Sequence, residues 1–276
     1  MKIMRDCYPL IRKFINSADP VHSAKDIKET WPLLFRKEHL LDHLHRLTGV
    51  QLEGKLSNIP RDVLLLLTSF LRSNTGNDRV VEWSLKVTHA ETNLGHKDAA
   101  SLGLIPLIVS YFKDDLDYLI QVHEASTEMT EDFLNNLPLC PVIVALGGSI
   151  FQCTCHLFVD RERVVSSISL KVALEYLFAV YYCLNIKYSP RVGATLEFLQ
   201  RYLVGISQEE GTKQEKRLKG VRSKVLAACS EIAIFKKKWS SVQQQRLEED
   251  RLMRSLVERL LLPLMPAAAQ GPPPPQ

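Results

Sequence analysis

The feature that most constrains the fold is a β-like block in the middle of a chain whose other apolar segments have helical spacing. Residues 141–148 form a short apolar run closed by two glycines, which is typical of a buried strand. Residues 153–159 alternate and are rich in β-compatible side chains, residues 160–163 form a polar turn, and residues 164–168 resume the apolar pattern. This block predicts a small antiparallel meander.

The segments that precede this block have the spacing of amphipathic helices. Pro32 suits the first turn of a helix and Gly49 can end it, after a series of leucines at helical spacing: Leu33, Leu34, Leu40, Leu41, Leu44 and Leu47. A further helix opens near Pro60 and runs apolar through Leu71. Residues 80–90 leave two interpretations open. Their alternation suits a strand, whereas their helical surroundings favour a helix.

Two amphipathic helices are expected after the block. The first has one apolar face made of Leu170, Ala173, Leu174, Leu177, Phe178, Tyr181 and Leu184. The second has an apolar face made of Leu196, Leu199, Tyr202, Leu203 and Ile206, and its polar side chains should point outward: Glu197, Gln200 and Arg201. Two more apolar stripes lie at residues 218–232 and 253–261 on charged helices. A coiled coil would need more clean heptads than these.

Together these patterns predict an α+β fold that is predominantly α-helical, with a small antiparallel sheet at about 141–168 packed by helices. Residues 1–136 form an N-terminal helical part, and residues 137–210 add the β-meander and two helices to the same fold. Residues 211–262 form a basic, charged helical extension. Residues 263–276 form a Pro-rich tail that we expect to be disordered or polyproline-like.

Composition indicates a globular protein of a reducing compartment. The chain has 276 residues, of which 46% are hydrophobic and 24% charged, so it can bury a core without disulfides or metals. Its six cysteines are sparse and lie in apolar segments, as buried thiols do. We expect no signal peptide, because residues 1–11 carry charges and Pro9 where a signal peptide needs an apolar core. We expect no membrane span, because no stretch is nearly uncharged and apolar over about 20 residues. The expected location is intracellular, either cytoplasmic or nuclear.

Charge is distributed unevenly along the chain. The net charge is +4, yet residues 213–238 hold nine cationic side chains and two acidic ones, which makes this segment +7 and the remainder −3. Such asymmetry indicates an anionic partner. The candidate binding residues, for nucleic acid or an acidic partner, are Lys213, Lys216, Arg217, Lys219, Arg222, Lys224, Lys236, Lys237, Lys238 and Trp239. The alternative is a solvated helix face that packs on an acidic surface of another protein or of this chain.

The histidines, cysteines and clustered acidic residues are the candidates for a metal or catalytic site. On a helix, His39 and His43 would share a face, but no third ligand is close in sequence, so a polar helix face is the better interpretation. On a strand, Cys153 and Cys155 would share a face that His156 would not, which predicts buried thiols. The acidic side chains that follow the apolar run 104–111 should form a solvated turn: Asp114, Asp115 and Asp117.

Gly147-Gly148-Ser149 follows a predicted strand, as phosphate-binding loops do. The motif lacks the Lys-Ser or Lys-Thr that ends such a loop, and another strand rather than a helix follows it. A tight turn is therefore expected there. The sequence thus predicts no catalytic residue, no metal and no cofactor.

Three strings resemble a recurring region of the sterile alpha motif domain-containing protein three family. They are Asp26-Ile-x-x-x-Trp31-Pro32-x-Leu-Phe35, Tyr181-Tyr182-x-Leu-Asn185-Ile-x-Tyr188, and Ala194-Thr195-Leu196-Glu197-Phe198-Leu199-Gln200-Arg201, which is the most distinctive. The resemblance covers roughly residues 25–212 and implies the helical region that follows the sterile alpha motif in those proteins. The motif itself is not expected before Asp26, so its polymerisation and docking are not transferred. Residues after about 213 depart from the family pattern.

The leading hypothesis is a non-enzymatic protein-interaction or scaffold protein whose protein partners are unidentified. The first alternative is a nucleic-acid-associated protein that binds phosphate backbones through residues 213–238. The second alternative is an enzyme with an unrecognised Cys or His site. No small-molecule substrate is indicated.

Overall fold

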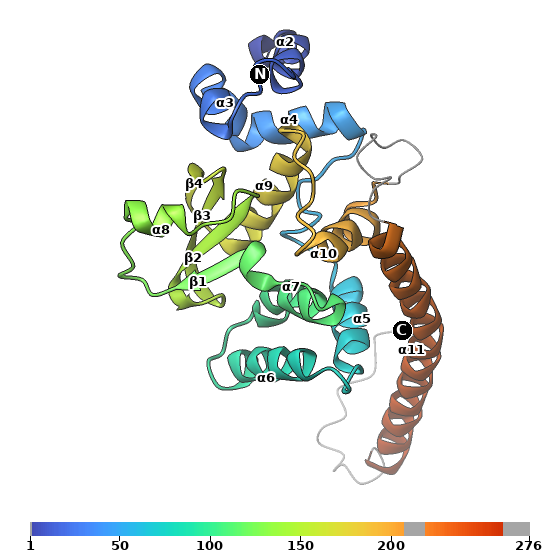
Figure 1. Cartoon of the computed structure of the whole chain (residues 1–276). Helices are drawn as coiled ribbons and strands as arrows, with labels where there is room; N and C mark the ends of the chain where they lie inside the picture. Colours follow the sequence, from blue (N-terminus) through green and yellow to red (C-terminus); the bar gives the residue numbers. More distant parts are fainter. Residues whose placement is uncertain (1, 207–218, 262–276) are drawn as a thin grey trace, which may run out of the picture. The chain divides into compact units, whose positions relative to one another are not determined.

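A computed structural model describes residues 2–206 and 219–261 and confirms an α+β fold that is predominantly helical (Figure 1). Before the first strand lie α1 (Lys2–Asp6), α2 (Tyr8–Ile15), α3 (Ala24–Thr30), η1 (Pro32–Phe35), α4 (Lys37–Thr48), α5 (Arg61–Arg72), α6 (Asp78–Thr92), α7 (Ala99–Phe112) and η2 (Leu116–Tyr118). Then come β1 (Ile120–His123), α8 (Glu131–Asn135), β2 (Val142–Ser149), β3 (Gln152–Val159), β4 (Glu162–Ile168), α9 (Leu170–Cys183), α10 (Gly193–Phe198), η3 (Leu199–Val204) and α11 (Lys219–Leu261). The chain divides into two compact units, Met1–Cys229 and Ser230–Gln276.

The sheet has four strands in the order β1-β2-β3-β4. Strands β2, β3 and β4 form the antiparallel meander that the sequence predicted. The sequence did not predict β1, which pairs in parallel with β2 from Ile120 opposite Ile143 to His123 opposite Leu146. The sheet is therefore mixed rather than purely antiparallel.

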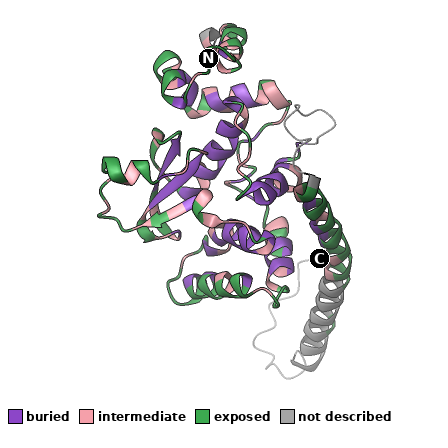
Figure 2. Ribbon diagram, in the orientation of Figure 1, coloured by how far each residue is buried: buried purple, intermediate pink, exposed green. Residues whose placement is uncertain are grey.

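Both faces of the sheet are covered (Figure 2). Helix α9 packs on β2 and β3 across one face, and most of its residues are buried. Across the other face lies an apolar cluster made of Leu137, Val142, Val144 and Phe158, against which Met129, Phe133, Leu134 and Leu146 pack. Because apolar side chains cover both faces, the β2 sequence reads as a continuous apolar run rather than an alternating one.

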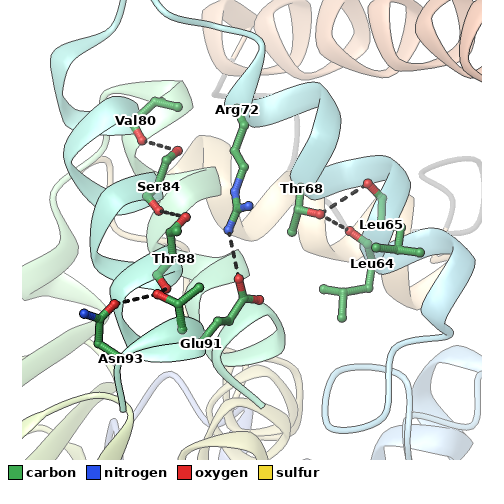
Figure 3. Close-up of polar contacts among 10 residues, drawn as sticks. Leu64, Leu65, Thr68, Arg72, Val80, Ser84, Thr88, Glu91 and Asn93 are labelled. Carbon is green, nitrogen blue, oxygen red and sulfur yellow. Dashed lines mark hydrogen bonds and ion pairs between the residues drawn. The ribbon is translucent and has the colours of Figure 1, made fainter. Parts of the chain in front are cut away.

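Residues 80–90, left open by the sequence, belong to helix α6. Asn77 caps this helix by accepting a hydrogen bond from the Val80 amide, and Val80 and Val87 are buried. Hydroxyl groups along α6 donate to carbonyls one turn earlier, while Arg72 of α5 points towards Glu91 of α6, at 3.8 Å (Figure 3). The strand-like alternation was therefore the wrong one of the two interpretations.

Helix α7 packs closely on α6, because Gly103 lies against Val87. A Cβ added at Gly103 would overlap the Cγ2 methyl of Val87. Apart from a few residues near its ends, α7 is buried, which explains why it is apolar all round. The tip of the β2–β3 hairpin reaches the same region, since Phe151 packs against Val87, Ala90 and Ala99.

The β3–β4 turn joins the sheet to the helices beside it. Asp160 and Arg161 both have positive φ, 49° and 65°, as a two-residue type I′ hairpin turn requires. The Asp160 carboxylate accepts a hydrogen bond from the Ala24 amide at 3.0 Å, and Arg161 Nε donates to the Leu137 carbonyl at 3.0 Å. The polar turn expected at residues 160–163 thus also holds the start of α3.

Candidate functional site

The predicted basic segment falls into three parts of the chain. Lys213, Lys216 and Arg217 lie outside the described residues, and Lys219 is the first residue of α11. Arg222 and Lys224 are exposed in the first turns of α11, which belong to the unit Met1–Cys229. The unit Ser230–Gln276 contains three exposed lysines and a half-buried indole: Lys236, Lys237, Lys238 and Trp239.

The three consecutive lysines cannot share one face of α11. Successive residues of an α-helix are rotated by about 100°, so Lys236, Lys237 and Lys238 point in three directions around the axis. A ligand that wraps part of the helix could contact all three, whereas a flat surface would contact one or two. The geometry favours electrostatic attraction over a shaped, base-reading site.

The start of α11 is held by the unit to which it belongs. Val225 and Ala228, two members of the predicted apolar stripe, are fully buried. Cys229 lies close enough to Arg201 and Glu197 to interact with them electrostatically, although burial is the main reason that the pKa of its thiol is raised. The first turns of α11 therefore lie against the segment formed by α10 and η3.

That segment contains a buried polar cluster. Arg201 Nε donates to Glu197 Oε1 at 2.9 Å, and the Tyr188 hydroxyl donates to Gln200 Oε1 at 3.1 Å. Glu197 is 5% exposed and Gln200 2% exposed, so the expectation that these side chains point outward was wrong. They tolerate burial because each has a polar partner. Gln200 and Arg201 lie in η3, a π-helical turn, which is a rare conformation that is frequent at functional sites.

Asp114 connects this segment to α7. Its Oδ2 accepts a hydrogen bond from the Thr195 amide at 2.8 Å, which caps the first turn of α10 from a distant part of the chain. Burial raises the pKa of Asp114, although the Thr195 amide and Lys224 of α11 favour its charged form. The prediction of a solvated acidic turn was therefore wrong for Asp114, and a single residue of that turn meets both α10 and α11.

We call the polar cluster of Glu197, Gln200 and Arg201, together with the start of α11 beside it, the anchor site, because its chemistry suits holding a helix in place. Its one thiol, Cys229, has a raised pKa and so a small thiolate fraction. The buried ion pair of Glu197 and Arg201 has its charges directed at each other. The arrangement places the buried start of α11 beside α10 and η3.

Helix α4, which contains His39, His43 and His45, places His43 in the core instead of on a polar face. His43 is 3% exposed, its ring centroid lies 4.7 Å from that of Tyr8, and its Nε2 atom has no hydrogen-bond partner. Burial lowers its pKa to about 4, and nearby Arg12 adds to this effect. The interpretation of a polar helix face was therefore wrong for His43. Within residues 2–206 and 219–261, no group of three metal-binding side chains was found.

The sequence correctly placed Cys153 and Cys155 on one face of β3, but its prediction that both thiols are buried was wrong for Cys153. Cys155 is fully buried and Cys153 partly exposed, on the same strand face. Their Sγ atoms are 3.6 Å apart, a proximity that the sequence argument overlooked although i, i+2 spacing on a strand was its signal. Gly147 and Gly148 have positive φ within β2, where the pairing with β3 is irregular, and the chain turns at Ile150 and Phe151. The tight turn predicted at Gly147-Gly148-Ser149 was therefore placed too early in the sequence.

Two further findings bear on function. In the part of the chain that the structure describes, no helix combines the length and apolar character needed to cross a bilayer. Comparisons with protein-family models, with curated proteins and with solved structures find no match for this chain.

Proposed function

We propose that this is a non-enzymatic, intracellular interaction protein in which the unit Met1–Cys229 holds α11 and the basic part of α11 binds an acidic surface of a protein partner. The observation that carries the proposal is the continuity of α11. One helix begins on the buried polar cluster of α10 and η3 and continues for a further 32 residues into the second unit. The free thiols of all six cysteines support a reducing compartment.

Helix physics supports a partner for α11. A helix gains most of its stability in proteins from packing an apolar or amphipathic face, and isolated helices are marginal in water. In the described part of the unit Ser230–Gln276, α11 is the only element, and these residues provide no second helix or strand for it to pack on. Exposed Lys236, Lys237 and Lys238 make an acidic partner the complementary choice.

The test compares two full-length variants of identical net charge. One carries Lys236→Glu, Lys237→Glu and Lys238→Glu. The matched control reverses three exposed lysines of the other unit: Lys25, Lys55 and Lys97. Proteins captured from nuclease-treated native cells are quantified by mass spectrometry, and the leading candidate is then purified and titrated against each variant.

We expect the purified partner to bind the α11 variant at least about tenfold more weakly than the control, with an affinity that falls as salt rises. Equal affinity for the two variants would overturn the proposal. A turnover of substrate by the purified protein that one polar substitution abolishes would overturn its non-enzymatic part.

The second candidate is binding to nucleic acid, which the same exposed lysines favour. Lysines that neutralise phosphates release counterions, so affinity for duplex falls with salt by roughly 0.9 log units per log unit of salt for each phosphate contacted. Captured material that disappears on nuclease treatment, and a shallower salt slope in the α11 variant than in the control, would support this candidate. An unchanged slope would eliminate it.

A further inference from the structure

Two thiols on β3 face each other at close range. Cys153 and Cys155 lie on the same side of the strand, and their Sγ atoms are 3.6 Å apart. Cys155 is 0% exposed, whereas Cys153 is partly exposed to solvent. The Cys153 thiol can therefore react with a reagent from solution, and the buried Cys155 thiol lies close enough to react with Cys153 afterwards.

The strand geometry decides what kind of bond the pair can form. Residues two apart on a strand have Cα atoms about 6.6–6.8 Å apart, at the upper limit of the roughly 4.4–6.8 Å that disulfides span. A disulfide at this limit is strained and easily reduced. A resident zinc ion would need about four ligands, and the described residues offer no cluster of three.

The pairing of β3 with both of its neighbouring strands is irregular near the two cysteines, so the backbone there can change to bring the two Cα atoms closer. The β2–β3 register shifts between Leu146 and Ser149, the stretch opposite Cys153. The β3–β4 register shifts between Cys155 and Leu157. Such irregularities bend and twist a strand locally, and bending shortens the distance between Cα atoms. The two cysteines thus lie between an irregularity of the β2–β3 ladder and one of the β3–β4 ladder.

We propose that Cys153 and Cys155 are a redox-active dithiol, which small-molecule disulfides of the glutathione class oxidise reversibly to an intrastrand disulfide. Cys153 is the attacking residue because it is the exposed one. Ionisation favours the same order, because the Cys155 thiol hydrogen-bonds the Cys153 thiolate. This bond lowers the pKa of Cys153 and raises that of Cys155.

The reaction balances in two exchanges. The Cys153 thiolate attacks one sulfur of the small-molecule disulfide, forms a mixed disulfide, and releases one small thiolate that takes up a proton. Cys155 then loses its proton and attacks Cys153 Sγ, which forms the protein disulfide and releases the second small thiol. Two protein thiols are oxidised and one small disulfide is reduced to two thiols. This inference does not depend on the proposed function of α11.

The test uses the reduced full-length protein in a series of glutathione redox buffers. After alkylation of free thiols, chymotrypsin cleaves after Phe151 and Leu157, which gives a peptide that contains both cysteines and no other. We expect this peptide to change from doubly alkylated to a form lighter by two hydrogens than the unalkylated dithiol. The change should reverse when excess reduced glutathione is added.

Three variants and an internal control separate the reaction from unfolding. Cys153→Ser should abolish the oxidised peptide, and Cys155→Ser should trap a mixed glutathione disulfide on Cys153. Cys140→Ser should leave the pair unaffected. Fully buried Cys183 should stay unmodified while the protein is folded. Double alkylation across the whole series, or oxidation that appears only together with modification of Cys183, would overturn the proposal.

Discussion

The buried imidazole of His43 makes stability depend on pH in a way that can be calculated. His43 lies in α4 with Tyr8 against its ring, Arg12 and Arg46 as cationic neighbours, and Asp42 as the opposing anionic neighbour. Burial is the largest influence, and the pKa falls from its ordinary value of 6.5 to about 4. The side chain is therefore uncharged in the folded protein at neutral pH.

The sign follows from proton binding by the two states. Between pH 6.5 and about 4, the unfolded chain binds a proton at this position and the folded protein does not, so acidification favours unfolding. At about 1.4 kcal/mol per pH unit, His43 removes roughly 3 kcal/mol of stability as pH falls through this window. Above pH 6.5 the contribution is constant.

Urea unfolding of the wild type and of His43→Leu across this pH range measures the effect. Carboxylates also titrate there, but both proteins contain the same ones, so the difference between their stabilities isolates His43. We expect His43→Leu to lose about 3 kcal/mol less than the wild type between neutral pH and pH 4. His89→Gln, at an exposed position of α6, should follow the wild type. If His43→Leu also follows the wild type, the argument from burial is refuted.

Three further substitutions test the packing of the unit Met1–Cys229, each by equilibrium unfolding. Gly103→Ala should destabilise by about 1–3 kcal/mol, because the new methyl overlaps Val87; a stabilised variant would refute the close contact. Glu175→Leu should lower the free energy of unfolding by about 2–4 kcal/mol, because Glu175 Oε1 accepts three hydrogen bonds, from the Gly54 amide and from the amide and hydroxyl of Ser57. Glu175→Gln keeps an acceptor there and should lower it clearly less. Asp160→Ala should lower the free energy of unfolding by about 1–3 kcal/mol, because alanine is less stable than aspartate at positive φ and the hydrogen bond from the Ala24 amide is lost. Asp160→Asn should have a stability near that of the wild type.

The meander was predictable because its information is local. Alternation and a polar two-residue turn lie within residues 141–168, and each specifies a strand or a connection by itself. The glycine pair instead marks an irregularity of β2 just before its turn into β3. Strand β1 has no such signal. It spans four residues, and what makes it a strand is the parallel pairing of Ile120 with Ile143, a contact between distant parts of the chain. Non-local pairing of this kind overrides a weak intrinsic preference.

The anchor site was missed for a related reason. Helical spacing correctly grouped the apolar residues of 196–206, and it assigned the polar ones to solvent by default. That default fails when a further element covers the polar side and each buried group finds a partner, as Glu197 does with Arg201. The signal that could have identified the site is the i, i+4 spacing of this opposite-charge pair, together with the apolar stripe that begins α11.

The composition of the anchor bears on how α11 could be used. A buried ion pair such as Glu197–Arg201 adds little net stability over an apolar pair, yet breaking it by removing one partner typically loses about 3–5 kcal/mol. The charge-assisted hydrogen bond between Glu197 and Arg201 is directional and fixes these two side chains within their own segment. Burial of Val225 and Ala228 restricts the start of α11 in the same unit. A protein that presents a binding helix to a partner benefits from that restriction, because a preorganised element loses less entropy on binding.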